Sequence, residues 1–401
     1  MSKTEMPSIR FYGFDNDWEQ RKLSEITDKV TEKNAGLQYV ETFTNSAEFG
    51  IISQRDFFDH DIAKLGSLDG YYIVKNEDFV YNPRISTSAP VGPINRNKLG
   101  RTGVMSPLYT VFRPHDIDTT YLEYFFKCGY WHSFMNFNGD SGARSDRFSI
   151  RDNVFFQMPI PIPDIDEQRK IGELLTCLDN LITLHQRKFE KLTNVKKSML
   201  EKMFPRNGSC YPEIRFKGFT DPWEQRRFGD VFEEYSEKNR AELPPLTIVQ
   251  GSGTIRRDES ERALQYDKAS LPSYKAVHEG DFIVHLRSFE GGLEKANSQG
   301  IVSPAYHTFR GEGIDSRFYY AYFRSKKFID TDLKPHVYGI RDGRNIDIEG
   351  MKTIEIPFTS YPEQRLIGDA IGAINTLITL HQRELEKLQS IKKALLEKMF
   401  V

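Results

Sequence analysis

The sequence is poor in cysteine and in long apolar runs, and these shortages exclude two classes of protein. Its three cysteines, Cys128, Cys177 and Cys210, show neither CxxC nor disulfide-framework spacing. This usage favours a reducing compartment and free, mostly buried thiols. No run approaches the roughly 18 apolar residues of a membrane helix, and the opening MSKTEMPSIRF lacks the apolar core of a signal peptide. The sequence therefore predicts a cytoplasmic protein with no membrane partner.

An excess of charge of one sign is also missing. The 401 residues hold 55 Lys and Arg against 57 Asp and Glu, for a formal net charge of −2. Without a global basic field, the total charge gives no argument for a nucleic-acid partner. The length exceeds that of one ordinary core and predicts at least two domains.

Motifs for catalysis, cofactors and metals are absent as well. Two Gly-x-Gly triplets, at 251–253 and 311–313, lack the third glycine of a dinucleotide or adenosyl loop. The segment Asn82–Ile85 carries arginine and isoleucine where an amino-methyltransferase needs proline and an aromatic residue. No glutamate has lysine two places on, and neither a P-loop nor an HExxH segment occurs. We therefore expect a non-catalytic chain with no metal site and no cofactor of its own.

What the sequence does have is one long internal repeat. Residues 9–23 read IRFYGFDNDWEQRKL, and residues 214–228 read IRFKGFTDPWEQRRF. The repeat closes with LITLHQRKFEKLTNVKKSMLEKMF at 181–204 and LITLHQRELEKLQSIKKALLEKMF at 377–400. A period near 200 residues indicates two large similar units rather than a solenoid. Each unit has a variable body, 1–163 or 205–359, and a near-constant tail, 164–204 or 360–401.

The tails carry the apolar spacing of a coiled coil. Steps of three and four residues alternate, with one shortened step in each copy before Val195 and Ile391. The predicted seam residues are Ile171, Leu175, Leu178, Ile182, His185, Phe189 and Leu192 in the first tail, and Ile367, Ile371, Ile374, Ile378, His381, Leu385 and Leu388 in the second. We interpret the two histidines as polar residues that fix the register, rather than as metal ligands or pH sensors.

Both tails begin with a capping signal and predict long helices. Ser360–Glu363 is a capping box, and Asp164–Glu167 is its acidic equivalent. A helix with one exposed apolar stripe needs a partner, and the other tail is the nearest one. We therefore expect an antiparallel coiled coil with a pseudo-two-fold relation between the bodies.

Each body is predicted to be a mixed α/β (α+β) domain around a twisted, largely antiparallel sheet. Short β-type runs such as 71–81, 103–112 and 154–162 are separated by Gly, Pro and Asn. Helices are expected at 118–136 and 315–331, and their many aromatic residues are more typical of a core than of a base-stacking platform.

The first local signal for DNA binding is a window without acidic residues. From Phe79 to His115 there is no Asp or Glu, and polar loop residues surround Arg84, Arg96, Lys98 and Arg101. Forked guanidinium donors suit phosphates and guanine edges. A surface loop with ordinary solvated arginines is an equally good interpretation. The second body keeps Arg287 opposite Arg84 but adds Glu290 and Glu294.

The second signal is a Gly-x-Arg-x-x-Arg segment in both copies. It places Arg144 and Arg147 in the first body, and Arg341 and Arg344 in the second. Arginines three apart can reach one backbone or base step together. The alternative is that they hold the loop to the sheet by salt bridges.

At this point the chain resembles a known family. It carries Trp-Glu-Gln-Arg at 18–21 and 223–226, Ser-Pro at 106–107 and 303–304, and a repeated LEKMF end. Glu-Gln-Arg also opens both tails, at 167–169 and 363–365. Over its full length the sequence is similar to the specificity (S) subunits of type I restriction–modification systems.

The resemblance implies two target-recognition domains that read a bipartite, asymmetric DNA site across a helical spacer. It also implies two docked modification (M) subunits, which bring S-adenosylmethionine and methylate adenine, and restriction (R) subunits that use ATP and Mg. Two other interpretations stay open. One is a non-catalytic coiled-coil scaffold that binds proteins, and the other is a single-chain methyltransferase or nuclease.

Overall fold

The computed structural model describes residues 6–58, 65–140, 146–206, 208–260, 268–285, 287–339 and 345–400. The chain divides into two compact units. Unit 1 comprises Met1–His185 with Glu384–Val401, and unit 2 comprises Gln186–Arg383. Each unit therefore contains one body and a part of both tails. The four segment boundaries expected from the sequence stay a prediction.

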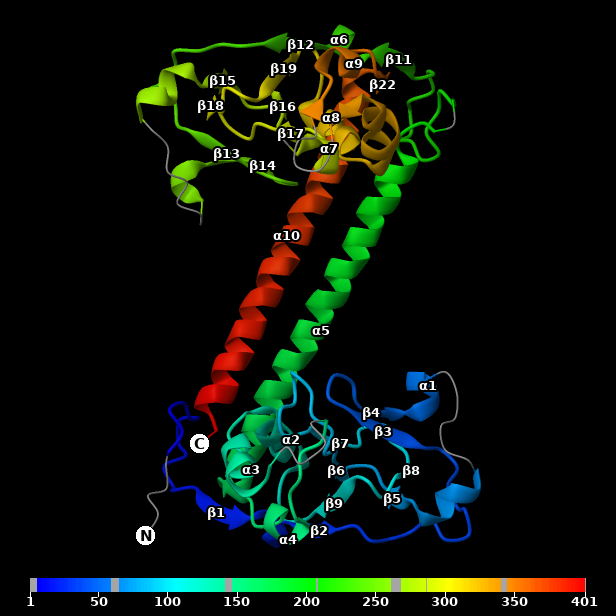
Figure 1. Ribbon diagram of the computed structural model, residues 1–401, viewed down its shortest axis with the longest axis vertical. Coiled ribbons are helices and arrows are strands. Elements are labelled where there is room, and N and C mark those ends of the chain that lie inside the picture. Colours follow the sequence, from blue (N-terminus) through cyan, green and yellow to red (C-terminus); the bar gives the residue numbers. More distant parts are fainter. Residues whose placement is uncertain are drawn as a thin grey trace. The chain divides into compact units, whose positions relative to one another are not determined.

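Two long helices correspond to the tails (Figure 1). They are α5 (Ile165–Lys202) and α10 (Tyr361–Lys398), each of 38 residues, or about 57 Å at 1.5 Å per residue. In unit 1 the first turns of α5 lie beside the last turns of α10, and Asp179 Oδ1 pairs with Lys392 Nζ at 2.5 Å. In unit 2 the last turns of α5 and the first turns of α10 share one apolar cluster. The predicted antiparallel helix pair is confirmed.

The apolar stripes of both helices face inward, with one interruption. Ile171, Leu175, Ile367 and Ile371 are almost fully buried, and the seam positions from Ile182 to Leu192 and from Ile374 to Leu388 are half-buried. Val195 and Ile391, which follow the shortened step, are each 39% exposed. These two residues lie outside the buried stripe, because the shortened three-residue step rotates their side chains away from the partner helix.

The Asp164 side chain caps α5 as predicted, since it accepts the amide of Asp166 at 3.4 Å, but the glutamates of both predicted capping boxes bind elsewhere. Glu167 accepts both ends of the Arg10 guanidinium at 2.8 and 2.9 Å, and Glu363 does the same for Arg215 at 2.7 and 2.9 Å. The indole N–H groups of Trp18 and Trp223 donate to the same carboxylates. A carboxylate buried in the first turn finds a stronger partner in a buried guanidinium than in a backbone amide.

Both bodies are built on antiparallel strands, and the second repeats the pairing of the first. In unit 1 the pairs are β1 (Glu19–Lys22) with β10 (Pro159–Ile162), β3 (Phe43–Ser46) with β4 (Gly50–Ser53) and β5 (Tyr72–Val74) with β8 (Gly103–Met105), and the four-stranded sheet has the order β2 (Thr27–Lys29), β9 (Thr110–Pro114), β6 (Phe79–Tyr81), β7 (Ile94–Arg96). In unit 2 the pairs are β11 (Glu224–Arg227) with β22 (Glu355–Phe358), β13 (Leu246–Val249) with β14 (Gly253–Arg256), β15 (Lys275–Val277) with β18 (Gly300–Val302) and β20 (Val337–Tyr338) with β21 (Asn345–Ile346), and the four-stranded sheet has the order β12 (Phe232–Tyr235), β19 (His307–Gly311), β16 (Phe282–Val284), β17 (Glu294–Lys295).

Short helices complete the bodies: α1 (Gln54–Phe58), α2 (Thr119–Lys127), α3 (His132–Asn138) and α4 (Asp152–Phe155) in unit 1, and α6 (Phe228–Val231), α7 (Ser288–Gly291), α8 (Ser316–Phe323) and α9 (Ile348–Lys352) in unit 2. The single helix expected at 118–136 is two, because Cys128 adopts an extended backbone that ends α2. The strand expected at 154–162 is confined to β10, because its first residues form the end of α4.

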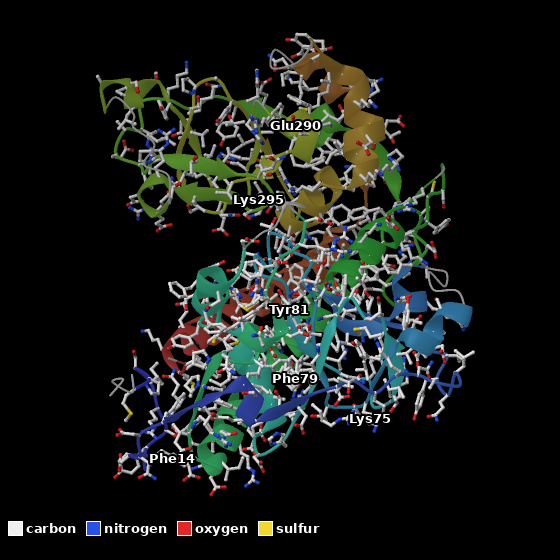
Figure 2. The ribbon with its side chains drawn as sticks, turned by 60° about the horizontal axis from the view of Figure 1, so that its bottom comes forward. Phe14, Lys75, Phe79, Tyr81, Glu290 and Lys295 are labelled. Carbon is white, nitrogen blue, oxygen red and sulfur yellow. The ribbon has the colours of Figure 1, made fainter. Side chains whose placement is uncertain are left out.

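The aromatic residues of α2 and α8 are core residues, as predicted. Tyr121, Phe125, Phe318 and Phe323 are fully buried. Phe79 and Tyr81 of β6 also lie inside unit 1 (Figure 2). Burying large rings on one helix face and one sheet face is the main stabilising contribution in each body.

The expectation of mostly buried thiols is wrong. All three cysteines are free, but only Cys128 is buried, while Cys177 and Cys210 are exposed. Cys177 lies on α5 outside the apolar stripe, so a residue type that is usually buried faces solvent there. Along the described ranges, no helix combines the length and apolar character that a membrane span requires.

Candidate nucleic-acid interface

Two predicted arginine segments of unit 1 meet in the fold. Arg84 and Arg147 face each other in an isolated antiparallel bridge. The amide of Ile85 donates to Asp146 O at 3.0 Å, and the amide of Phe148 donates to Pro83 O at 2.7 Å. Both arginines are exposed. Segments about 60 residues apart thus bring two exposed arginines to neighbouring stretches of backbone. Exposed arginines are among the side chains that contact DNA phosphates.

Residues on either side of the Gly-x-Arg-x-x-Arg segments pair in antiparallel fashion in both copies. In unit 1, Asp140 and Ser149 exchange backbone hydrogen bonds at 3.1 and 2.7 Å. In unit 2, β20 and β21 pair Val337 with Ile346 and Tyr338 with Asn345. The predicted site residues Arg144, Arg341 and Arg344 lie outside the described residues.

A hollow of about 520 Å³ lies beside the bridge in unit 1. Arg147 lines it together with the rings of Tyr72, Tyr81 and Tyr109. The ammonium group of Lys33 lies 3.6 Å from the centre of the Tyr72 ring, on the same part of the body. Aromatic faces beside cations suit a base or sugar next to a phosphate. We take the Arg84–Arg147 bridge and this hollow as the candidate interface of unit 1.

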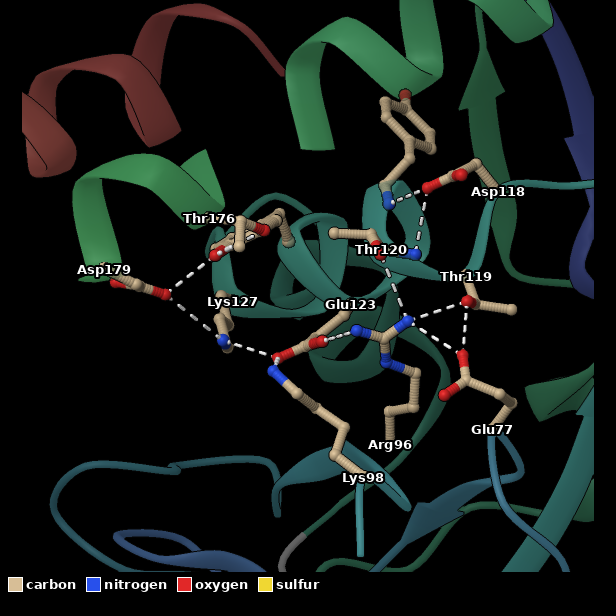
Figure 3. A network of polar contacts seen from close by, with 12 residues as sticks. Glu77, Arg96, Lys98, Asp118, Thr119, Thr120, Glu123, Lys127, Thr176 and Asp179 are labelled. Atoms are coloured by element: carbon tan, nitrogen blue, oxygen red, sulfur yellow. Dashed lines mark hydrogen bonds and ion pairs between the residues drawn. The ribbon is translucent and has the colours of Figure 1, made fainter. Parts of the chain in front are cut away.

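Arg96 is bound into the protein's own interior (Figure 3). Its side chain is 8% exposed. One terminal nitrogen donates to Glu77 Oε2 at 2.9 Å and to Thr119 Oγ1 at 2.7 Å, and the other lies 2.6 Å from Glu123 Oε2. With these partners Arg96 ties β7 to α2. The geometry therefore favours a structural role for Arg96 over a DNA contact.

Lys98 and Arg101 are exposed but paired. Lys98 Nζ lies 3.2 Å from Glu123 Oε1, and Arg101 makes two bonds of 2.8 Å to Glu41. The hydrogen bond from Arg101 holds the pKa of Glu41 below its usual value, although partial burial acts in the opposite direction. The cations of the acid-free segment thus pair with carboxylates that come from other parts of the chain.

Arg287 of unit 2 is exposed and occupies the position equivalent to Arg84. Its amide donates to His285 Nδ1 at 3.3 Å. Burial, and then the charges of Arg324 and Arg287, lower the pKa of His285 to about 4. Glu294 is fully buried and accepts the amides of Gly251 and Gly253, so it is not an exposed acid of this segment. Glu290, labelled in Figure 2, lies on the short helix α7.

No group of three or more His, Cys, Asp or Glu side chains within the described ranges could hold a metal ion.

Residues 15–194 match the family model described as the type I restriction modification DNA specificity domain. This part of the chain is therefore similar to that specificity domain. The resemblance predicted from the repeated motifs is confirmed. The match covers the first body and most of α5.

Two curated relatives are specificity subunits from Methanocaldococcus jannaschii. The putative type I restriction enzyme MjaX specificity subunit is 23% identical over 262 residues, covering 62% of this chain and 60% of the relative. The type I restriction enzyme MjaVIII specificity subunit is 25% identical over 264 residues, covering 61% of each. The matched part thus spans about three fifths of these relatives.

Among solved structures, the type I restriction–modification S subunit from M. genitalium has the same fold. It superimposes with a TM-score of 0.59 at 12% identity and covers 99% of both chains. The predicted fold class, two mixed α and β bodies joined by two long helices, is confirmed.

Sequence reasoning missed the residues that fix each body to its helix. Gln168 Oε1 accepts the amide of Asp118 at 2.9 Å, and Gln364 Oε1 accepts that of Asp315 at 3.0 Å. These two glutamine side chains position the starts of α2 and α8, while the Glu167 and Glu363 carboxylates hold the Arg and Trp of the opening motifs. The sequence did contain a signal for these residues, because the Glu-Gln-Arg segment that includes them is identical in both copies.

Proposed function

We propose that this chain is the sequence-specific DNA-recognition subunit of a type I restriction–modification complex. The observation that carries the proposal is the match of residues 15–194 to the specificity domain, together with a second body that repeats its strand pairing. Each body would read one half of a bipartite, asymmetric site. The bridge of Arg84 with Arg147 supplies the unit 1 contact, and Arg287 supplies one in unit 2.

In this proposal the chain itself is non-catalytic. Two M subunits would dock on it and bring S-adenosylmethionine to methylate adenine. R subunits would supply ATP- and Mg-dependent cleavage. The helices α5 and α10 would set the gap between the half-sites, since about 57 Å of helix exceeds one DNA turn of roughly 34–36 Å. The cytoplasmic location stays a prediction.

Methylome sequencing of cells that express this chain with its M subunit tests the proposal directly. The expected result is methylated adenine in one bipartite, asymmetric motif. Methylation without a fixed motif, or no methylation by a complex that assembles normally, would refute DNA recognition and favour the protein-binding scaffold. Methyl transfer by the isolated chain would instead favour a single-chain enzyme.

The variant Arg84→Ala/Arg147→Ala tests the candidate interface. In the assembled complex we expect weaker DNA binding and a salt dependence of log K reduced by about one to two units, because each phosphate contact releases about one counterion. Arg101→Ala is a matched control, since Arg101 is already paired with Glu41. An unchanged salt dependence in the double variant would show that the bridge is ordinary surface.

A further inference from the structure

Unit 2 contains a hollow of about 570 Å³ between the last turns of α5 and the end of α8. Lys196, Lys197 and Leu200 line it from α5, and Arg324, Lys326 and Lys327 line it from the end of α8. Its lining combines apolar surface from Phe204, Pro205 and Tyr322 with these lysines and arginines. This composition suits a ligand that carries an anionic group next to an aliphatic or aromatic part.

Unit 1 contains the equivalent hollow, of about 650 Å³. The repeat aligns three lining residues of α10, Lys392, Lys393 and Leu396, with Lys196, Lys197 and Leu200 of α5. It also aligns Lys127 with Arg324. The two copies therefore form equivalent hollows, and their lining residues can be compared position by position.

The unit 1 hollow is neutralised by carboxylates of the same unit. Lys392 pairs with Asp179 at 2.5 Å. Lys127 lies 2.7 Å from Glu123 and 3.8 Å from Asp179 (Figure 3). Both carboxylates are missing from the second copy, where Asn375 replaces Asp179 and Tyr320 replaces Glu123.

The unit 2 hollow consequently carries an unbalanced positive charge. Among the described residues, Lys196 makes no ion pair, although it is half-buried. Burial, and then the charge of Arg324, lower the pKa of Lys196. Arg324 is bound to the buried Glu294 and Lys327 to Asp332 at 2.8 Å. A half-buried lysine beside an arginine is stabilised when an anion joins them.

The other charged groups that line the hollow leave a cationic excess. Lys197, Lys326 and Arg206 are exposed and form no ion pair with any described residue, while the acidic lining residues are Glu201 and Asp330. Lys326 and Arg206 come from two different segments of unit 2. Their convergence on one hollow favours a ligand that accepts several hydrogen bonds at once.

The chemistry of the hollow also matches the proposed function. Its cations are lysines and arginines that line one hollow, and these are the residues through which proteins neutralise the phosphates of DNA. A backbone phosphate is therefore the anion that fits the proposed function of this chain.

We propose that the hollow of unit 2 binds a phosphate group of the nucleic-acid backbone, and that the neutralised hollow of unit 1 does not. The inference rests on the proposed function and makes it asymmetric. One body would hold the DNA through an extra backbone contact next to its long helix.

The test measures DNA affinity against salt concentration for the chain assembled with its partner subunits. Lys196→Gln removes the cation, and Asn375→Asp introduces the carboxylate that neutralises the other copy. For both variants we expect the slope of log K against log salt to fall by about 0.9, the value for one phosphate contact. Lys392→Gln is the matched control at the equivalent position and should leave the slope unchanged.

Two results would overturn the inference. One is an unchanged slope in both Lys196→Gln and Asn375→Asp while wild type binds DNA. The other is binding of inorganic phosphate by the full chain that Lys196→Gln abolishes, with DNA binding unaffected, since the hollow would then hold a free ion. Absence of DNA binding by the wild-type complex would instead count against the proposed function. Thermal unfolding of each variant verifies that it is folded, and Asn375→Asp reproduces a residue already tolerated in unit 1.

Discussion

Single residues shared by the two copies fix each body to its long helix. Glu167 is fully buried and Glu363 is 1% exposed, and each binds an arginine and a tryptophan from the opening motif of its own copy. The hydrogen bond to the carboxylate raises the pKa of both Arg10 and Arg215. The repeated Trp-Glu-Gln-Arg and Glu-Gln-Arg segments are therefore partly explained by folding rather than by DNA contact.

Glu167→Gln should destabilise unit 1 by about 3–5 kcal/mol, because it leaves the Arg10 guanidinium without its charged partner. The free energy of unfolding of the full chain in urea measures the effect. Arg169→Gln is the control, since its ion pair with Asp166 is exposed, and we expect a change within about 0.5 kcal/mol. Equal effects of the two variants would contradict the role of the buried carboxylate.

At the scale of elements, each long helix contributes its end to the core of the unit that contains the other copy's body. Phe400, at the end of the second tail, packs against Tyr121 and Phe125 of α2 with ring centres 5.4 and 6.3 Å apart. Phe204, at the end of the first tail, packs against Phe318 and Tyr322 of α8. The Met and Phe of each repeated LEKMF end are therefore core residues, of unit 2 for the first tail and of unit 1 for the second.

Phe400→Ala should therefore destabilise unit 1 by about 3–5 kcal/mol, the usual cost of removing a buried phenylalanine ring. Unfolding of the full chain, followed by a probe in α2, provides the measurement. Phe137→Ala offers a matched control because Phe137 is 89% exposed. If Phe400→Ala unfolds like wild type, the end of the tail is not part of the core of unit 1.

For the whole molecule, the proposed spacer depends on two helices of equal length. Both α5 and α10 have 38 residues, so a change in one requires the same change in the other. A seven-residue insertion preserves the alternation of the apolar stripe.

Inserting one heptad after His185 and another after Arg383 should lengthen the accepted gap between half-sites by about three base pairs. Seven residues add about 10.5 Å of helix, and B-DNA rises about 3.4 Å per base pair. Methylome sequencing measures the gap, and the half-site sequences should stay the same. An unchanged gap in an active complex would refute the spacer role, and insertion in one helix only serves as a control that should impair assembly.

The sequence predicted the helices, the two bodies and the aromatic cores well, because these depend on periodic patterns and on local backbone preferences. It predicted the site less well. Arg84 and Arg147 lie together as donors, whereas Arg96, from the same acid-free window, is buried against Glu77 and Glu123. A window of sequence shows which charges are neighbours along the chain, but not which carboxylates the fold brings to them.

By itself, then, the sequence determined the duplication, the long helices and the similarity of residues 15–194 to the specificity domain. Only the tertiary structure decided which cations are available. Asp179 neutralises Lys392 because antiparallel packing brings α5 and α10 together, and Asn375 leaves Lys196 without that partner. The physical reason is that the strength of an electrostatic interaction depends on the distance between the groups and on their burial. Both quantities depend on the tertiary structure and cannot be read from the order of residues.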